Sequence, residues 1–152
     1  MVEEKEETKK KKISTGLIID NSELKKNRIF PDEIRNEVHD APFYLLIFIS
    51  REEVLKINCF PTKTNNVKKI LIKLEEFSPD LVNGISDVLK ELDLRKYVLH
   101  ITGLCYEVKD CYYEAFIVGD ELGQEDVGEV KRRFLQIEKV VDVIFEDIQA
   151  LD

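Results

Sequence analysis

The residues with the clearest potential for chemistry lie at a turn within the segment 69–94. Ser78, Pro79 and Asp80 end an alternating apolar pattern and precede a pattern with the period of a helix. Ser78 is a favourable N-cap residue, and Pro79 falls at the first helical position, where its missing N–H costs nothing. Backbone N–H groups at such a helix start can bind a carboxylate or a phosphate. The turn is therefore either a binding site of this kind or a junction that only packs the helix on the sheet.

Other residues that could support catalysis or metal binding are few. The chain has two histidines, His39 in a polar stretch and His100 in an apolar strand pattern, where a structural role is expected. The motifs HxxxH, CxxC, GxGxxG and GxxxxGK[ST] are absent from the sequence. Asp142 and Glu146 share a face of the last predicted strand, but no base accompanies them, so we expect a solvated face. We therefore predict a protein that is not an enzyme and has no metal site or cofactor.

Composition sets the broad class of the protein. With 152 residues and 43% hydrophobic content, the chain is long enough for one domain with an additional segment. The formal net charge of -8 argues against nucleic-acid binding, because such a surface repels phosphate backbones. No apolar run approaches the roughly 18 residues of a membrane span, and the first residues lack the apolar core of a signal peptide. The high content of Lys, Glu and Ile without Trp is compatible with a thermophilic source.

The cysteines also bear on localisation. Cys59, Cys105 and Cys111 are odd in number and form no CxxC pair. We interpret them as buried, mostly inert thiols of a protein in the reducing cytoplasm.

The predicted elements divide the chain into three parts. Residues 1–12 are nearly all Glu and Lys and predict a disordered charged tail. Residues 13–66 predict an N-terminal segment with a short strand, a short helix and the two strands of a β-hairpin, at 16–21, 31–38, 43–49 and 54–60. The strand predicted at 69–75 would add to this hairpin as the third strand of a meander.

From residue 67 onward the predicted order is β, α, β, β, α, β. The helix that starts at Pro79 carries an apolar stripe, and a tight turn at Lys109 and Asp110 joins the two middle strands. The remaining elements are strands at 97–108, 111–118 and 140–148 and a helix at 126–136. This order predicts an α+β fold of the ferredoxin-like type, in which an antiparallel sheet carries two helices on one face. The other sheet face then needs a cover, either from a second subunit or from the N-terminal hairpin.

Three pieces of the sequence resemble the ACT domain, a ligand-sensing regulatory module of amino-acid metabolism. They are the strand and proline turn at 74–82, the helix at 85–92, and the helix end at 130–134 that leads into the strand at 140–143. The resemblance covers residues 67–149, roughly half of the chain. It implies a non-catalytic allosteric regulator that forms a homodimer or higher oligomer, binds a small amino-acid effector at a subunit interface, and acts on a partner enzyme or regulator.

The resemblance also implies the position of the ligand site. In ACT domains the effector is held by the first strand–helix turn and by the second strand of a partner subunit. Transferred to this sequence, the site comprises Glu76, Phe77, Ser78, Pro79, Asp80, Leu81 and Val82, together with Arg95 after the first helix.

The turn departs from the ACT pattern at several positions. The family has Gly where this chain has Asp80, and members with serine-like effectors have Asn at the positions of Phe77 and Arg95. Two hypotheses therefore stand: a metabolite-sensing regulator, or a protein-interaction module that kept the fold and lost the ligand. Two further classes with this element order fit less well, because acylphosphatases need an Arg in the first turn and RNA-recognition domains need a basic residue and Gly near their strand aromatics.

Overall fold

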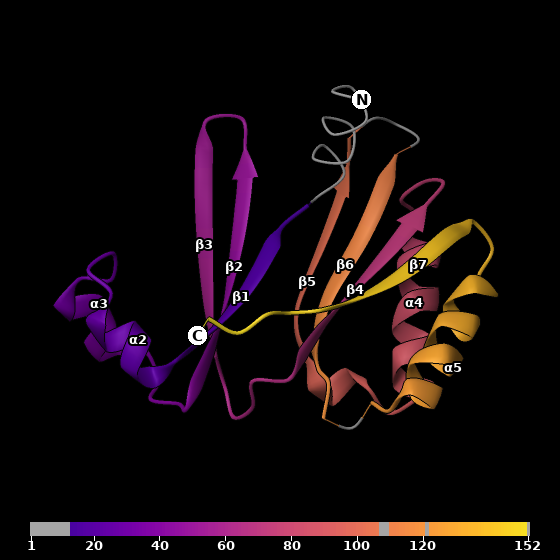
Figure 1. Ribbon diagram of the computed structural model, residues 1–152. Coiled ribbons are helices and arrows are strands. Elements are labelled where there is room, and N and C mark those ends of the chain that lie inside the picture. The colour runs from indigo at the N-terminus through magenta and orange to yellow at the C-terminus, as the bar shows by residue number, and fades with distance from the viewer. Residues whose placement is uncertain (1–12, 107–109, 121, 152) are drawn as a thin grey trace, which may run out of the picture. The chain divides into compact units, whose positions relative to one another are not determined.

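The computed structural model describes residues 13–106, 110–120 and 122–151, which belong to two compact units (Figure 1). Of the described residues, those between 66 and 147 form the C-terminal unit, and those at 13–65 and 148–151 form the N-terminal unit. Within the described residues, seven strands form two antiparallel sheets and four short α-helices accompany them. The predicted α+β class is confirmed. The predicted disordered tail at 1–12 lies outside the described residues.

The N-terminal unit is built on a sheet with the strand order β1-β2-β3. Its strands are β1 (Thr15–Asp20), β2 (Phe43–Arg51) and β3 (Val54–Thr62). The predicted hairpin is confirmed, since β2 pairs antiparallel with β3 from Phe43 opposite Thr62 to Arg51 opposite Val54. Residues from the chain's far end join this unit: Ala150 forms a parallel bridge with Ile18, and the Leu151 N–H donates to the Ile18 carbonyl at 2.7 Å.

Two short helices, α2 (Asn21–Lys26) and α3 (Asp32–Glu37), follow β1. Asp20 caps α2, because its carboxylate accepts a hydrogen bond from the Glu23 N–H at 2.8 Å. The apolar cluster between α2 and the sheet is formed by Ile19, Leu24, Tyr44 and Leu46. The helix predicted from the Pro31 region is confirmed as α3, whereas α2 was not predicted.

The predicted meander is wrong in its third strand. The third strand of the first sheet is β1, whereas the segment predicted to extend the hairpin is β4 (Val67–Leu74) and belongs to the other sheet. Alternation in a sequence shows which side chains share a face, but it does not identify the neighbouring strand. The neighbours of β4 are β6 and β7, which lie far from it in the sequence.

The C-terminal unit contains a four-stranded antiparallel sheet with the order β5-β6-β4-β7. Its other strands are β5 (Val98–Cys105), β6 (Cys111–Val118) and β7 (Val140–Asp147). In Figure 1, β4 and β6 run through the middle of this sheet and β5 and β7 form its edges. Of the predicted turn between β5 and β6, Lys109 lies outside the described residues.

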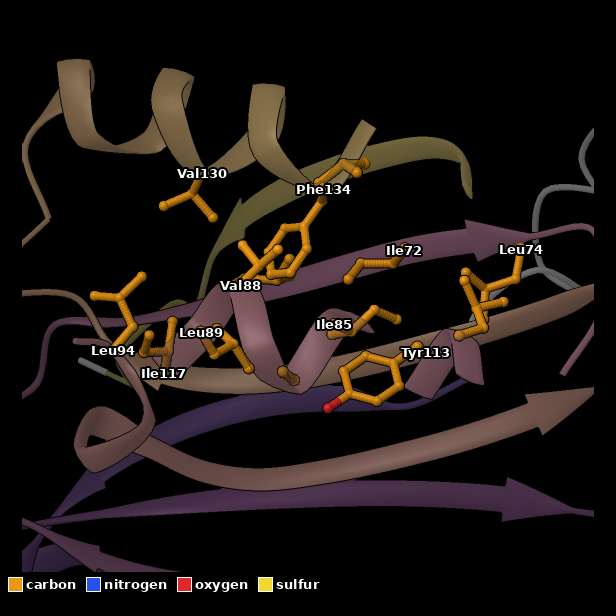
Figure 2. Close-up of a cluster of buried hydrophobic side chains, with 14 of the residues drawn as sticks. Ile72, Leu74, Ile85, Val88, Leu89, Leu94, Tyr113, Ile117, Val130 and Phe134 are labelled. Carbon is orange, nitrogen blue, oxygen red and sulfur yellow. The ribbon is translucent and has the colours of Figure 1, made fainter. Parts of the chain in front are cut away.

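Two helices cover one face of this sheet, α4 (Pro79–Glu91) and α5 (Gln124–Leu135), and a 3-10 turn, η1 (Arg95–Tyr97), follows α4. Side chains of both helices meet those of β4 and β6 in one apolar cluster (Figure 2). The predicted stripe on α4 is confirmed at four buried positions, Leu81, Ile85, Val88 and Leu89. From α5, Val130 and Phe134 complete the cluster. The cluster fixes α4, and with it the turn at Ser78, against the sheet.

The two faces of β6 differ. Tyr113, Ala115 and Ile117 belong to the cluster under the helices. On the other face, Glu114 forms an ion pair with Lys69 of β4 at 3.3 Å, and the Lys69 ammonium lies 5.5 Å from the Phe116 ring centre.

The prediction of inert thiols is wrong for two of the three cysteines. Cys105 and Cys111 form a disulfide, and they are opposite each other in the register of β5 and β6. Sequence spacing did not reveal the pair, because the bond depends on a hairpin register that brings the two Cα atoms to 4.0 Å. Cys59 is free and half-buried, and burial raises the pKa of its thiol.

Among the described residues, no helix is both long and apolar enough to cross a membrane.

Candidate functional site

The turn that precedes α4 has the capping geometry that the sequence predicts. Ser78 has extended backbone angles, and its Oγ accepts a hydrogen bond from the Leu81 N–H at 3.3 Å. The Ser78 carbonyl accepts from the Val82 N–H at 3.1 Å, and Pro79 occupies the first helical position. These contacts use most of the donors of the first turn. Of the backbone N–H groups in this turn, that of Asp80 is the one without a hydrogen-bond acceptor among the described residues.

A hollow of about 250 Å³ lies beside this turn. One wall comes from the start of α4, and the other comes from the connection between α5 and β7. The lining residues are Ser78, Asp80, Leu81, Ile137, Glu138 and Lys139. Leu81 supplies a buried apolar surface, whereas Asp80, Glu138 and Lys139 are exposed and place charges around it.

Backbone geometry holds the second wall in place. Lys139 has a φ of 74°, in the left-handed region that few non-glycine residues adopt, and this reverses the chain between α5 and β7. The Lys139 carbonyl accepts a hydrogen bond from the Glu75 N–H at 2.9 Å. The connection is thereby attached to the residue that follows β4, only a few positions before Ser78.

Charges of both signs surround the hollow. The Lys139 ammonium forms an ion pair with the Glu76 carboxylate. Its hydrogen bond to Glu76 and the charge of that carboxylate raise the pKa of Lys139, which therefore stays protonated at neutral pH. The carboxylates of Asp80 and Glu138 provide negative charge on the same rim. A ligand with both an ammonium and a carboxylate group would find a partner for each, whereas the single available N–H of the helix start makes a simple anion a poor ligand.

The structure brings four of the eight predicted site residues to the hollow. Ser78, Asp80 and Leu81 line it, and Glu76 contacts its rim through Lys139. Pro79 and Val82 belong to the first turn of α4 but do not line the hollow.

Phe77 has a different position, because its ring lies on the backbone of Gly103 in β5. A Cβ atom at Gly103 would lie 2.4 Å from Phe77 Cζ, so the ring occupies the space that a side chain would need. Phe77 remains 38% exposed. Its ring therefore fills the space between the turn and the edge strand.

Arg95 lies in η1, after the C-terminal end of α4. A 13-residue helix separates it from the turn, which corresponds to about 20 Å at 1.5 Å per residue. Arg95 instead acts on Tyr113, where burial raises the pKa of the phenol and the Arg95 charge opposes that change. Within one chain, Arg95 is therefore not part of the hollow.

The sequence did not indicate Ile137, Glu138 and Lys139. They lie in a short connection without a recognisable motif, and Lys139 adopts its left-handed backbone without being glycine or asparagine. Their position beside Ser78 follows from the pairing of β4 with β7, which alternation alone does not specify.

A second hollow, of about 230 Å³, lies at the other end of α4. Buried apolar side chains form part of its lining, and carboxylates with local partners stand around it: Asp93 with Lys96 at 3.0 Å and Glu129 with Arg132 at 2.6 Å. The lining residues are Leu92, Asp93, Leu94, Tyr97, Leu122, Asp126, Glu129 and Val130.

Within the described part of the chain, no group of three or more His, Cys, Asp or Glu side chains is arranged to hold a metal ion. No protein-family model matches the chain, and no curated protein is significantly similar to it in sequence. The candidate site is therefore defined by its own geometry: a capped helix start, an apolar wall and charges of both signs.

Proposed function

We propose that the C-terminal unit is a ferredoxin-like domain of the ACT type, a non-catalytic regulatory domain that binds a free amino acid at the turn before α4. The order β5-β6-β4-β7, with two helices on one face, is the arrangement expected for a β, α, β, β, α, β chain of this type. The effector would change how the protein acts on a partner enzyme or regulator.

The observation that carries this proposal is the hollow beside Ser78. Its volume of about 250 Å³ lies below the ~300–1,000 Å³ of sites for drug-sized ligands, which favours an amino-acid-sized molecule. Asp80 and Glu138 suit an α-ammonium group, Lys139 suits an α-carboxylate, and Leu81 provides an apolar contact. The open side of the hollow leaves room for a second subunit, which could contribute its own Arg95.

A thermal-shift screen against the twenty amino acids tests this function. A ligand that binds only the folded state at 100 times its Kd stabilises that state by about 2.7 kcal/mol, which raises the melting temperature measurably. If no amino acid raises the melting temperature at millimolar concentration, the proposed function is wrong.

Two variants locate the ligand once the screen has identified one. Asp80→Asn should change its affinity about tenfold, equivalent to about 1.4 kcal/mol, because the charge that faces the ammonium is lost. The same change should lower stability by only about 0.3–1 kcal/mol, because an acid in the first turn favours the helix dipole. Asp87→Asn is the matched control, since Asp87 is also exposed on α4 but does not line the hollow. Equal affinities in the two variants would place the ligand elsewhere.

A second candidate function is that of a protein-interaction module without a small ligand. It is favoured by Phe77, which fills the space between the turn and β5, and by large apolar side chains on the edge strands. Ile101 on β5 and Val141 and Ile144 on β7 are 44–49% exposed, and each of these strands has a described neighbour on only one side. In this case no amino acid alters the melting temperature, and Ile101→Lys or Ile144→Lys abolishes self-association.

A further inference from the structure

The Cys105–Cys111 disulfide lies at the turn end of the hairpin formed by β5 and β6, where β5 is an edge strand of the sheet. Cys105 is the last residue of β5, whose described neighbour is β6 alone. Cys105 is exposed, whereas Cys111 is fully buried in the cluster beneath α4 and α5. Cys111 is also opposite Leu74, the last residue of β4. The bond therefore joins an exposed strand end to the sheet interior, beside the point where β4 enters the turn at Ser78.

The contact between Phe77 and Gly103 links this disulfide to the turn. Gly103 is two residues before Cys105, so both residues face the same side of the sheet. The ring of Phe77 lies on Gly103, and Phe77 directly precedes the N-cap residue Ser78. The position of the Phe77 ring thus depends on the end of β5 that the disulfide holds in place.

Reduction removes the side-chain link at that end, so that the last residue pair of β5 and β6 is held only by the chain connection between the strands and by backbone hydrogen bonds such as that from the Tyr106 N–H to the Asp110 carbonyl. The terminal residues of an edge strand are held by hydrogen bonds to one neighbour, and such ends open at a low free-energy cost. When the end of β5 opens, Phe77 loses the backbone surface on which it lies. The turn at Ser78 then loses a contact that helps to fix its conformation.

The chemistry requires a dithiol reductant. One of its thiolates attacks the sulfur of the exposed Cys105, the Cys105–Cys111 bond breaks, and Cys111 leaves as a thiolate that takes up a proton. The second thiol of the reductant then attacks the mixed disulfide and releases the Cys105 thiol. The protein gains two electrons and two protons, and the reductant becomes a disulfide.

We propose that the redox state of the Cys105–Cys111 pair controls the order of the turn at Ser78 through the contact between Phe77 and Gly103, so that reduction loosens the turn. This regulation rests on the proposed function in one respect only: weaker binding of an amino acid by the reduced protein is a consequence if the turn binds one.

Hydrogen exchange tests the coupling without any ligand. The oxidised protein should show one free thiol after denaturation, and dithiothreitol should raise this number to three, since the chain has three cysteines. Reduction should accelerate amide exchange in the segment 75–82 about tenfold. Cys105→Ser should show the fast exchange with or without reductant. Cys59→Ser is the matched control and should behave like the unmodified protein, because Cys59 belongs to the other unit and is not bonded.

A second variant tests the route of the coupling. In Gly103→Ala the new Cβ displaces the Phe77 ring, which is partly exposed and can swing outward. The oxidised variant should already show fast exchange at 75–82, and reduction should add little. If exchange at 75–82 is the same in the oxidised and reduced protein, or if three free thiols are present under oxidising conditions, the proposal is overturned.

Binding separates this proposal from the proposed function. The screen with the twenty amino acids is repeated on the oxidised and reduced protein. If no amino acid binds in either state, the proposed function fails, while the exchange rates alone decide the coupling. If an amino acid binds equally well in both states although exchange differs, the regulation of the site is refuted.

Discussion

Replacing Gly84 by alanine should stabilise the protein. Gly84 lies in the interior of α4, and no glycine among the described residues has a positive φ, so alanine fits its backbone. A Cβ at this position would lie 3.6 Å from Cγ2 and 3.9 Å from Cδ1 of Ile137, which are ordinary van der Waals distances. Alanine is favoured over glycine in a helix by about 1 kcal/mol, and a buried methyl group adds up to about 0.8 kcal/mol. We expect a gain of about 1–1.5 kcal/mol, because the methyl group is only partly buried.

The measurement is urea unfolding followed by far-UV circular dichroism, in which the midpoint should rise while the slope stays constant. Gly128→Ala is the matched control, because Gly128 lies in the interior of α5 and its added Cβ would meet no atom within 4 Å. It should show the gain from helix propensity alone, up to about 1 kcal/mol. The difference between the two variants then reports the contact with Ile137.

A loss of stability in Gly84→Ala would refute this reasoning. It would show that another backbone approaches Gly84 more closely than Ile137 does, as in a helix crossing with a second subunit. Light scattering on the same sample identifies that case, because the variant would then also dissociate an oligomer.

Three further outcomes follow from the described contacts. Ser78→Ala should lower the free energy of unfolding by about 1 kcal/mol in urea titrations, and Ser78→Asp should retain most of the stability because Asp caps equally well; equal stability of all three proteins would contradict the capping role. Burial, with the charge of Asp110 and a hydrogen bond to it, raises the pKa of Tyr112 to about 12 from 10.0, so its stabilising contribution is complete below pH 10.0 and is lost as the pH rises to about 12. Absorbance at 295 nm, compared with Tyr112→Phe, should show this late ionisation, and a titration of Tyr112 near its ordinary pKa would contradict it. The exposed edge strands β5 and β7 predict a dimer or larger assembly, and a strict monomer in light scattering at micromolar concentration would contradict it.

Helix starts and strand faces could be predicted from this sequence because they depend on residues that are close together in the chain. Ser78 and Pro79 determine how α4 begins through groups within one turn of each other, and the alternation of Tyr113, Ala115 and Ile117 indicates one face of β6. The predictions that failed concern contacts created by strand pairing, some between residues distant in the sequence and one, the Cys105–Cys111 bond, between residues only six positions apart. The pairing of β4, the Cys105–Cys111 bond and the position of Lys139 all depend on strand order or register, which hydrophobic patterning does not encode.

The candidate site likewise has one part that the sequence predicted and one part that it did not. The half that precedes and begins α4 was predicted by its capping residues, whereas the wall formed by Ile137, Glu138 and Lys139 was not. Phe77 was expected to face a ligand, but Gly103 offers a flat backbone surface that holds its ring. A glycine in a strand indicates a close approach, yet the sequence does not say which residue approaches.

The bridge between Ile18 and Ala150 has a consequence for the order in which the protein is made. Its two residues are 150 − 18 = 132 positions apart, and the whole C-terminal unit lies between them in the chain. At roughly 5–20 residues per second, a ribosome needs on the order of 7–26 seconds to add the second residue after the first. During this time β1 can pair with β2, but its outer edge lacks the partner segment at 148–151. The N-terminal unit is therefore the first to be started and the last to be completed, and its final strand contact forms only after the C-terminal unit has been synthesised.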